Sequence, residues 1–214
     1  MLIFKYTKLS NLISTLENGI FASDPSTLND PYETYGIDTS GLRICCLSKS
    51  QNAKLMWSHY ADGHRGCSIG IEVPNNFDEL NGLLHFVKYT NYAECNRQTD
   101  RIERLFCKDK KWNYEKEVRA IYDSNNYDSN DWKRKSGKVF LKVSIKRVAF
   151  GSSVDLTSSD FITSLLWIKR FNDNQKHSKD RIEVIKYIAC DDGFRFKKDL
   201  SFNYEEILNN YPCQ

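Results

Sequence analysis

The sequence predicts an α+β fold from the pattern of its apolar residues. Many short segments are continuously apolar or alternate between apolar and polar residues, whereas only three or four carry apolar residues at helical spacing. These segments are intermixed without the strand–helix–strand alternation that predicts a parallel sheet. No internal repeat and no linker rich in Pro, Gly or Ser divides the 214 residues. We therefore expect one domain over residues 1–214, with a core at about residues 3–190 and a charged C-terminal tail.

The N-terminal residues predict a strand, a helix and a second strand. Ile3–Tyr6 is a short strand, and Thr7 is a suitable cap for the helix after it. The apolar side chains of this helix lie at helical spacing, and Gly19 is its expected end. They are Leu9, Leu12, Ile13 and Leu16. Ile20–Ala22 then returns as a strand, and a turn-rich loop runs from Asp24 to Pro31.

The middle of the chain predicts a buried strand and an amphipathic helix. Leu42–Ser48 is the strand, and Ser50 can cap the helix that Gly63 ends. The apolar stripe of that helix consists of Ala53, Met56, Trp57, Tyr60 and Ala61. Two more strands are expected at Cys67–Val73 and Leu83–Tyr89.

The second half of the chain predicts two helices and three strands. A helix at residues 99–110 would bury Ile102, Leu105 and Phe106, and a strand at Glu117–Tyr122 follows. Over residues 138–146 the side chains alternate without a break, so that one face of a strand would carry Val139, Leu141, Val143 and Ile145. The strand is expected to continue through Gly151. An amphipathic helix is expected at Ser158–Phe171 and a last strand at Ile182–Cys190.

The charges are nearly balanced. With 31 basic and 28 acidic residues, the formal net charge is +3. A dedicated nucleic-acid-binding protein usually carries a clearer basic stripe, so this balance permits contact with nucleic acid without requiring it. We expect the four densest basic stretches to be solvated surface. These are residues 108–111, 133–135, 142–147 and 195–198.

The cysteines and the apolar runs favour a reduced, cytoplasmic protein. The seven cysteines contain no CxxC pair, and no charged and then apolar leader precedes Lys5. We expect Cys45, Cys46, Cys67 and Cys190 to be small buried apolar side chains. No apolar run approaches the roughly 20 residues that a membrane helix needs, so no membrane partner is expected.

The most informative motif is the segment WNYEKEVR at residues 112–119. On a strand, Glu115, Glu117 and Arg119 would project from one face, because successive side chains alternate. Two acids and a guanidinium beside Trp112 and Tyr114 are better suited to binding a polar ligand than to packing a core. The alternative is a solvated edge on which Arg119 and Lys116 pair with the two acids.

Three ordered motifs resemble a known family. The N-terminal strand and helix lead to NDPYE at residues 29–33, the sequence MWSHYA follows at residues 56–61, and WNYEKEVR is later joined by RVAFG at residues 147–151. This set resembles a bacterial domain-of-unknown-function family with an NDP-[FY]-E loop and an MW-x-x-Y-A helix. The order of the motifs is also similar to that of the DarT-type ADP-ribosyltransferases.

The second resemblance implies a fold and a function. The fold would be an ADP-ribosyltransferase-like split antiparallel or mixed β-sheet core with flanking helices. The activity would be transfer of ADP-ribose from NAD, used as a substrate, to a nucleic acid or protein acceptor. The role would be that of a bacterial toxin or phage-defence effector, with an antitoxin or regulatory partner.

The resemblance also implies roles for individual residues. Glu117 would be catalytic, with Glu115 and Arg119 beside it, because a fixed carboxylate stabilises the cationic ribose formed when the nicotinamide bond breaks. The residues implied in NAD binding are Lys5, Tyr6, Ser48, Trp57 and Tyr60. Those implied in closing the pocket or orienting the acceptor are Asn29, Asp30 and His59. The chain departs from the superfamily pattern in having no His or Arg on its first strand.

Two other functions remain open. The first is a non-catalytic module that binds a nucleotide or a protein partner on the same fold, which the missing His or Arg favours. The second is a metal-dependent nuclease using Glu115, Glu117 and Asp30, since carboxylates suit magnesium. The spacing of His59, His64 and Cys67 fits no standard zinc pattern, so no metal site is expected from them. Trp57 and Tyr60 lie on the apolar stripe of their helix, and residues in such positions are more often part of the core.

Overall fold

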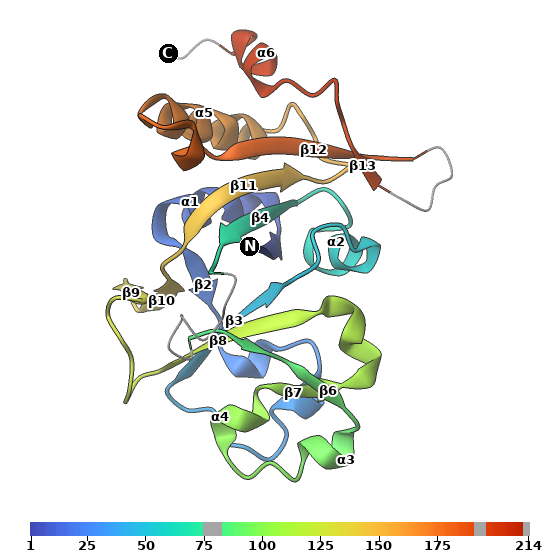
Figure 1. Ribbon diagram of the computed structural model, residues 1–214, viewed down its shortest axis with the longest axis vertical. Coiled ribbons are helices and arrows are strands. Elements are labelled where there is room, and N and C mark those ends of the chain that lie inside the picture. The colour runs from blue at the N-terminus through green and yellow to red at the C-terminus, as the bar shows by residue number, and fades with distance from the viewer. Residues whose placement is uncertain (75–82, 191–195, 212–214) are drawn as a thin grey trace. The chain divides into compact units, whose positions relative to one another are not determined.

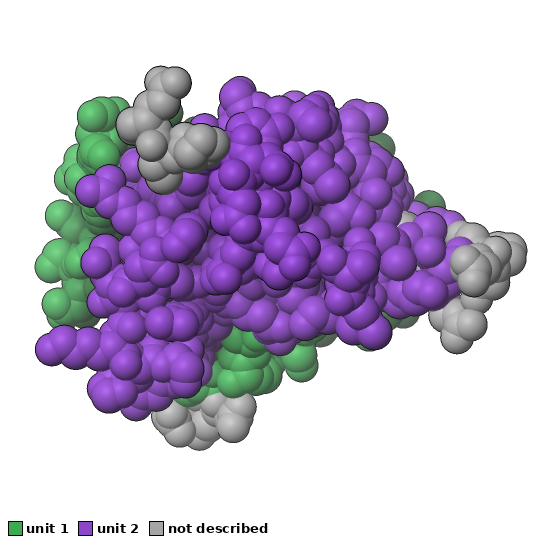
Figure 2. All heavy atoms as spheres, turned by 90° about the horizontal axis from the view of Figure 1, so that it is seen from above, with its two compact units in different colours: residues 1–3, 18–50, 73–143 green, residues 4–17, 51–72, 144–214 purple. Residues whose placement is uncertain are grey.

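The computed structural model describes residues 1–74, 83–190 and 196–211 (Figure 1). It confirms the expected α+β class, with several helices and a mixed β-sheet. The chain forms two compact units that alternate along the sequence, coloured green and purple in Figure 2. Unit 1 comprises residues 1–3, 18–50 and 73–143, and unit 2 comprises residues 4–17, 51–72 and 144–214. Among the described residues, none of the helices has both the length and the apolar character needed to span a membrane.

Unit 1 is built mainly from short strands and 3₁₀ helices. Strand β3 (Leu42–Ser48) pairs antiparallel with β8 (Glu117–Asp123), and β5 (His85–Phe86) pairs with the other edge of β8. The remaining strands are β2 (Ile20–Ala22), β6 (Lys88–Thr90), β7 (Cys107–Asp109), β9 (Trp132–Lys135) and β10 (Lys138–Leu141). The helices are η2 (Pro25–Thr27), η3 (Pro31–Glu33), α3 (Tyr92–Cys95), α4 (Arg101–Arg104) and η5 (Lys110–Glu115). Leu42, Ile44 and Leu105 form a core cluster.

Unit 2 contains a mixed sheet covered by the longest helix of the described chain. Strand β11 (Ser144–Phe150) pairs antiparallel with β4 (Cys67–Glu72) and parallel with β12 (Glu183–Ala189). The other elements are η1 (Leu9–Asn11), α1 (Leu12–Asn18), α2 (Lys54–Tyr60), α5 (Ser159–Asp173), η6 (Ser178–Asp180), β13 (Phe196–Lys198) and α6 (Tyr204–Asn209). Strand β1 (Leu2–Thr7) begins in unit 1 and ends in unit 2. Helix α5 packs Phe161 edge-on against Phe150 of β11, with ring centroids 4.7 Å apart.

Several predicted elements are confirmed because their local signals agree with their surroundings. The first strand, the Ile20–Ala22 strand and the Leu42–Ser48 strand are present, and Ser158 caps α5 through its hydroxyl. Gly19 ends the first helix with a φ of +97°. A side chain at this position would overlap the carbonyl oxygen of Leu141, so glycine is required there. The predicted side-chain caps Thr7 and Ser50 are wrong, since Lys8 and Ala53 occupy the cap positions without a side-chain bond.

The prediction of one continuous helix at residues 99–110 is wrong. Asp100 caps a single four-residue turn, α4, and the chain then becomes strand β7 at Cys107. Parallel pairing of β7 with β6 satisfies the backbone groups that a longer helix would have satisfied. Leu105 and Phe106 are nevertheless buried, as predicted.

Two predicted long strands are each divided. Residues 83–89 give β5, which pairs with β8, and then β6, which pairs with β7. Residues 138–151 give β10, which lies between β2 and β9, and then β11 in the sheet of unit 2. The alternation of apolar and polar residues continues from β10 into β11. The strand nevertheless ends between them, because its hydrogen-bonding partners change.

The expectations about cysteines and basic stretches are partly wrong. Cys45 and Cys67 are buried as expected, whereas Cys46 and Cys190 are only half-buried. Residues 133–135 are half-buried or exposed, but Lys108 is 2 % exposed and belongs to the interior. Arg195, in the last basic stretch, lies outside the described residues.

Candidate functional site

Glu117 and Arg119 form a buried, two-pronged ion pair on β8. Arg119 Nε donates to one oxygen of Glu117 at 2.9 Å and Nη2 donates to the other at 2.8 Å. The third arm, Nη1, donates to the Leu105 carbonyl at 2.6 Å. Both side chains are buried, so the predicted alternation on one strand face is confirmed for this pair. The solvated-edge interpretation is wrong.

Glu115 lies close to this ion pair, but it is not on the same strand as predicted. It ends the 3₁₀ helix η5 and is therefore not on the strand, and Lys116 follows with a φ of +44°. This left-handed residue ends the helix and leads the chain into β8, and Lys108 contacts both Glu115 and Glu117 on either side of it. Ser48 holds the turn, because its hydroxyl donates to the Glu115 carbonyl at 2.6 Å.

Lys108, from β7, lies among the acids. Its ammonium group is 2.6 Å from a Glu115 oxygen and 3.4 Å from a Glu117 oxygen. It also donates to Asn29 Oδ1 at 3.0 Å, while the amide nitrogen of Asn29 donates to Glu115 at 3.2 Å. The expectation that this lysine is solvated is therefore wrong. No local signal in the sequence distinguishes it from its exposed neighbours Lys110 and Lys111.

Glu33 completes the arrangement and was not predicted as a site residue. It is the last residue of η3 and of the NDPYE motif, and it is buried. One carboxylate oxygen lies 3.3 Å from the Lys108 ammonium, and the other pairs with Arg119 Nη2. We call these five side chains the charge cluster. They are Glu33, Lys108, Glu115, Glu117 and Arg119.

The charge cluster contains three carboxylates and two cations, so its acids are not equivalent. Burial opposes ionisation of Glu117, but the charges of Arg119 and Lys108 outweigh it and lower its pKa to about 2. For Glu33, burial outweighs the same two cations and raises the pKa. Glu117 is thus the permanent carboxylate of the cluster, and Glu33 is an acid whose proton affinity is increased.

The depressed pKa of Glu117 predicts a loss of stability in acid. A carboxyl whose pKa is about 2 when folded and near its ordinary 4.5 when unfolded stabilises the fold above pH 4.5, and that contribution is lost as the pH falls toward 2. The pH dependence of stability that Glu33 contributes has the opposite sign, because a raised pKa in the folded protein favours the protonated carboxyl. Urea unfolding at several pH values should therefore show a shallower decline between pH 4.5 and 2 for Glu117→Gln than for the exposed control Glu103→Gln. Identical slopes would contradict this account.

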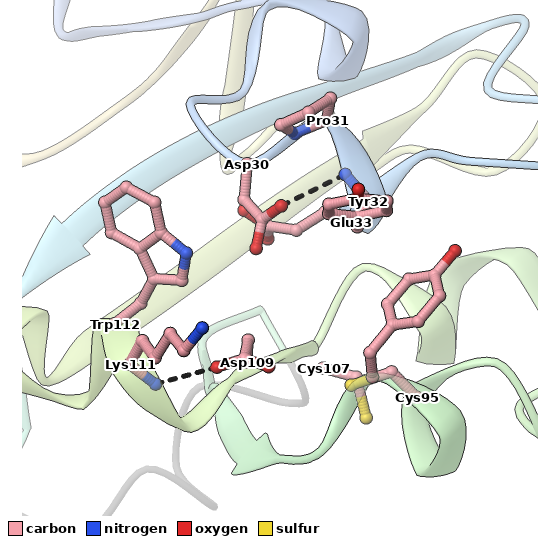
Figure 3. A pocket seen from close by; sticks show the side chains of 10 residues that line it. Asp30, Pro31, Tyr32, Glu33, Cys95, Cys107, Asp109, Lys111 and Trp112 are labelled. Carbon is pink, nitrogen blue, oxygen red and sulfur yellow. Dashed lines mark hydrogen bonds between the residues drawn. The ribbon is translucent and has the colours of Figure 1, made fainter.

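A cavity of about 600 Å³ borders the charge cluster (Figure 3). It is lined by Asp30, Pro31, Tyr32, Glu33, Tyr92, Cys95, Cys107, Asp109, Lys111 and Trp112. Glu33 belongs both to this lining and to the charge cluster, which joins the two features. Asp30 also lines the cavity. Its side chain accepts a hydrogen bond from Tyr32 N at 3.1 Å, which stabilises the local turn at the start of η3.

Aromatic side chains line the cavity, and a buried arginine outside the lining supports two of its walls. The rings of Tyr32 and Tyr92 meet edge-on with centroids 4.8 Å apart, and the Lys108 ammonium lies 4.9 Å from the Trp112 ring centroid. Arg104 is buried and donates to the Cys95 carbonyl at 3.0 Å and to the Tyr32 carbonyl at 3.1 Å. This guanidinium therefore links η3 and α3, the two elements that carry Tyr32 and Cys95 into the cavity lining.

The other predicted site residues belong to unit 2. Tyr6 and Trp57 are buried core residues with ring centroids 5.2 Å apart, and burial raises the pKa of Tyr6. Lys5 and Tyr60 are half-buried, and His59 is exposed on α2. The core interpretation of Trp57 is confirmed. By contrast, Asn29, Asp30, Ser48, Glu115, Glu117 and Arg119 all lie in unit 1.

The nuclease hypothesis meets a physical obstacle in the charge cluster. Lys108 occupies the position among Glu33, Glu115 and Glu117 that a divalent ion would take. Nowhere in residues 1–74, 83–190 or 196–211 are three or more His, Cys, Asp or Glu side chains grouped so that they can hold a metal ion.

Comparison with known proteins gives one partial match. A family model described as a protein of unknown function (DUF2971) matches residues 56–120. This stretch includes the MWSHYA helix, Lys108 and the start of β8, and it supports similarity to a domain-of-unknown-function family. No curated protein and no solved structure matches the chain. The family description assigns no activity.

Proposed function

We propose that this protein is an NAD-dependent ADP-ribosyltransferase that binds the nicotinamide–ribose end of NAD in the cavity of unit 1. The observation that carries the proposal is the position of Glu33, a buried carboxyl shared by the cavity and the charge cluster. The order of the sequence motifs supports the same reading. On this proposal the protein is a toxin or phage-defence effector.

The walls of the cavity suit the oxidised nicotinamide ring. That ring is planar and positively charged, so the faces of Trp112 and Tyr32 attract it through stacking and cation–π contact. Asp30, Asp109 and Glu33 add negative charge along the lining, and Lys111 offers a partner for a phosphate. The volume of about 600 Å³ lies within the usual range of ligand pockets.

The carboxyl of Glu33 can then serve the reaction. The bond between the nicotinamide nitrogen and ribose C1 breaks, and its electron pair leaves with nicotinamide. The ionised Glu33 stabilises the positive charge that develops on the ribose. As the acceptor attacks C1 it loses a proton, and the raised pKa of Glu33 makes it a competent base. Glu117 does not line the cavity and acts as a positioning residue, since it holds Arg119 against Glu33.

Release of nicotinamide from NAD tests the proposal. Glu33→Gln keeps the size of the side chain but removes its charge, and we expect roughly a hundredfold loss of activity, typical of a lost charge-stabilising group or general base. The matched control Glu103→Gln changes an exposed acid on α4 of the same unit and should retain activity. Equal activity of wild type and Glu33→Gln would show that Glu33 takes no part in the reaction.

The second candidate is a binding module without catalysis. It is favoured by the ion pairs that already engage each carboxylate of the charge cluster. In that case NAD or another nucleotide should raise the melting temperature by mass action, with Trp112→Ala abolishing the increase and no nicotinamide released.

A further inference from the structure

Strands β2, β10 and β9 form a small sheet in unit 1 (Figure 1). The side chains on its two faces differ. Strands β9 and β10 form a hairpin closed by Ser136 and Gly137, whose φ values are +50° and +75°. Positive φ at both turn residues is typical of the tight two-residue turn that fits the twist of paired strands. The register of the hairpin is therefore well defined.

This register assigns each side chain to a face, because cross-strand partners share a face. Lys138 pairs with Lys135, and Phe140 pairs with both Lys133 and Phe21. These five residues therefore share one face. The opposite face carries the buried residues Ile20, Ala22, Trp132, Val139 and Leu141, together with the exposed Arg134. We call Phe21, Lys133, Lys135 and Lys138 the lysine face.

The lysine face concentrates positive charge. Residues 132–141 contain four basic and no acidic residues, and three of the four, Lys133, Lys135 and Lys138, lie on this face. The ammonium groups of Lys133 and Lys135 donate to the same oxygen of Asn18, at 3.0 and 3.1 Å. Neither Lys135 nor Lys138 forms an ion pair with any residue that the structure describes.

An aromatic ring stands among these charges. Phe21 is 47 % exposed and meets the buried Phe140 edge-on, with ring centroids 5.8 Å apart. An exposed ring beside a row of lysines on a sheet face is the combination that binds single-stranded nucleic acid, since the cations contact phosphates and the ring stacks on a base. A duplex already stacks its bases on each other and leaves none for the ring.

We propose that the lysine face binds single-stranded nucleic acid. Phosphates of the strand contact Lys133, Lys135 and Lys138, and an unpaired base stacks on Phe21. None of these residues lines the cavity, so the inference does not depend on NAD binding.

Fluorescence anisotropy with a labelled 20-nucleotide single strand, titrated at several salt concentrations, tests the inference. The double variant Lys135→Gln/Lys138→Gln should bind more weakly and reduce the slope of log K against log salt by about 1.4, the value for two lost phosphate contacts on a single strand. Phe21→Leu keeps an apolar side chain but removes the aromatic face, and should weaken binding about tenfold with the slope unchanged. Thermal unfolding of each variant verifies that it is folded.

The control is Lys176→Gln/Lys179→Gln, which removes the same charge from exposed positions of unit 2 and should bind as wild type does. A duplex of the same sequence should bind more weakly than the single strand. Unchanged affinity and slope in the Lys135/Lys138 variant, or equal affinity for the duplex, would overturn the proposal.

Discussion

Replacing Arg119 by methionine is expected to cost about 3–5 kcal/mol of unfolding free energy. The guanidinium is fully buried, and it neutralises Glu117 through two hydrogen bonds and pairs with Glu33. Its removal leaves two buried carboxylates with Lys108 as their only cationic partner among the described residues. Urea unfolding at neutral pH measures the effect.

Two further variants make this test specific. Arg97→Met removes the same charge from an exposed position in unit 1 and should change stability by less than about 0.5 kcal/mol. The double variant Arg119→Met/Glu117→Leu removes both partners and should recover part of the loss, because an apolar pair avoids the unpaired charge. A loss below about 1 kcal/mol in Arg119→Met would show that the ion pair is not an integral part of the fold.

Replacing Trp57 by alanine is expected to cost about 3–5 kcal/mol through loss of core packing in unit 2. The side chain is 1 % exposed, and its ring centroid lies 5.2 Å from that of Tyr6 and 5.7 Å from that of Tyr187. Trp57→Phe should cost much less. The indole nitrogen makes no hydrogen bond to any residue that the structure describes, so its removal leaves no partner unsatisfied.

Thermal and urea unfolding of the two Trp57 variants separate a core role from a cofactor role. His59→Ala, at an exposed position on the same helix, serves as the control and should stay within about 0.5 kcal/mol of wild type. If Trp57→Ala left stability unchanged but abolished NAD binding, the cofactor role that the family resemblance implies would be correct and the packing account wrong.

The parts of the fold that sequence predicts well are those set by local patterns. The apolar run Leu42–Ser48 becomes β3, and the spacing of Phe161, Leu165 and Ile168 places all three on the buried face of α5. The ion pair of Glu117 with Arg119 follows from the same reasoning, because residues two apart on a strand share a face.

The charge cluster could not be predicted in full because it is assembled over long sequence distances. Glu33 and Lys108 come from different elements and meet through the fold, and each lies among residues that read as loop or solvated charge. Glu115 depends on a left-handed Lys116, a conformation that a lysine does not signal. The cavity beside the cluster is likewise bounded by η3, α3, β7 and η5, whose pairing no periodic pattern reveals.

A crystal structure of the protein soaked with NAD tests the central claim most directly. The account predicts that the nicotinamide ring lies against Trp112 and Tyr32, with a ribose hydroxyl within hydrogen-bonding distance of the Glu33 carboxylate. NAD bound elsewhere on the molecule, with this cavity left empty, would contradict it.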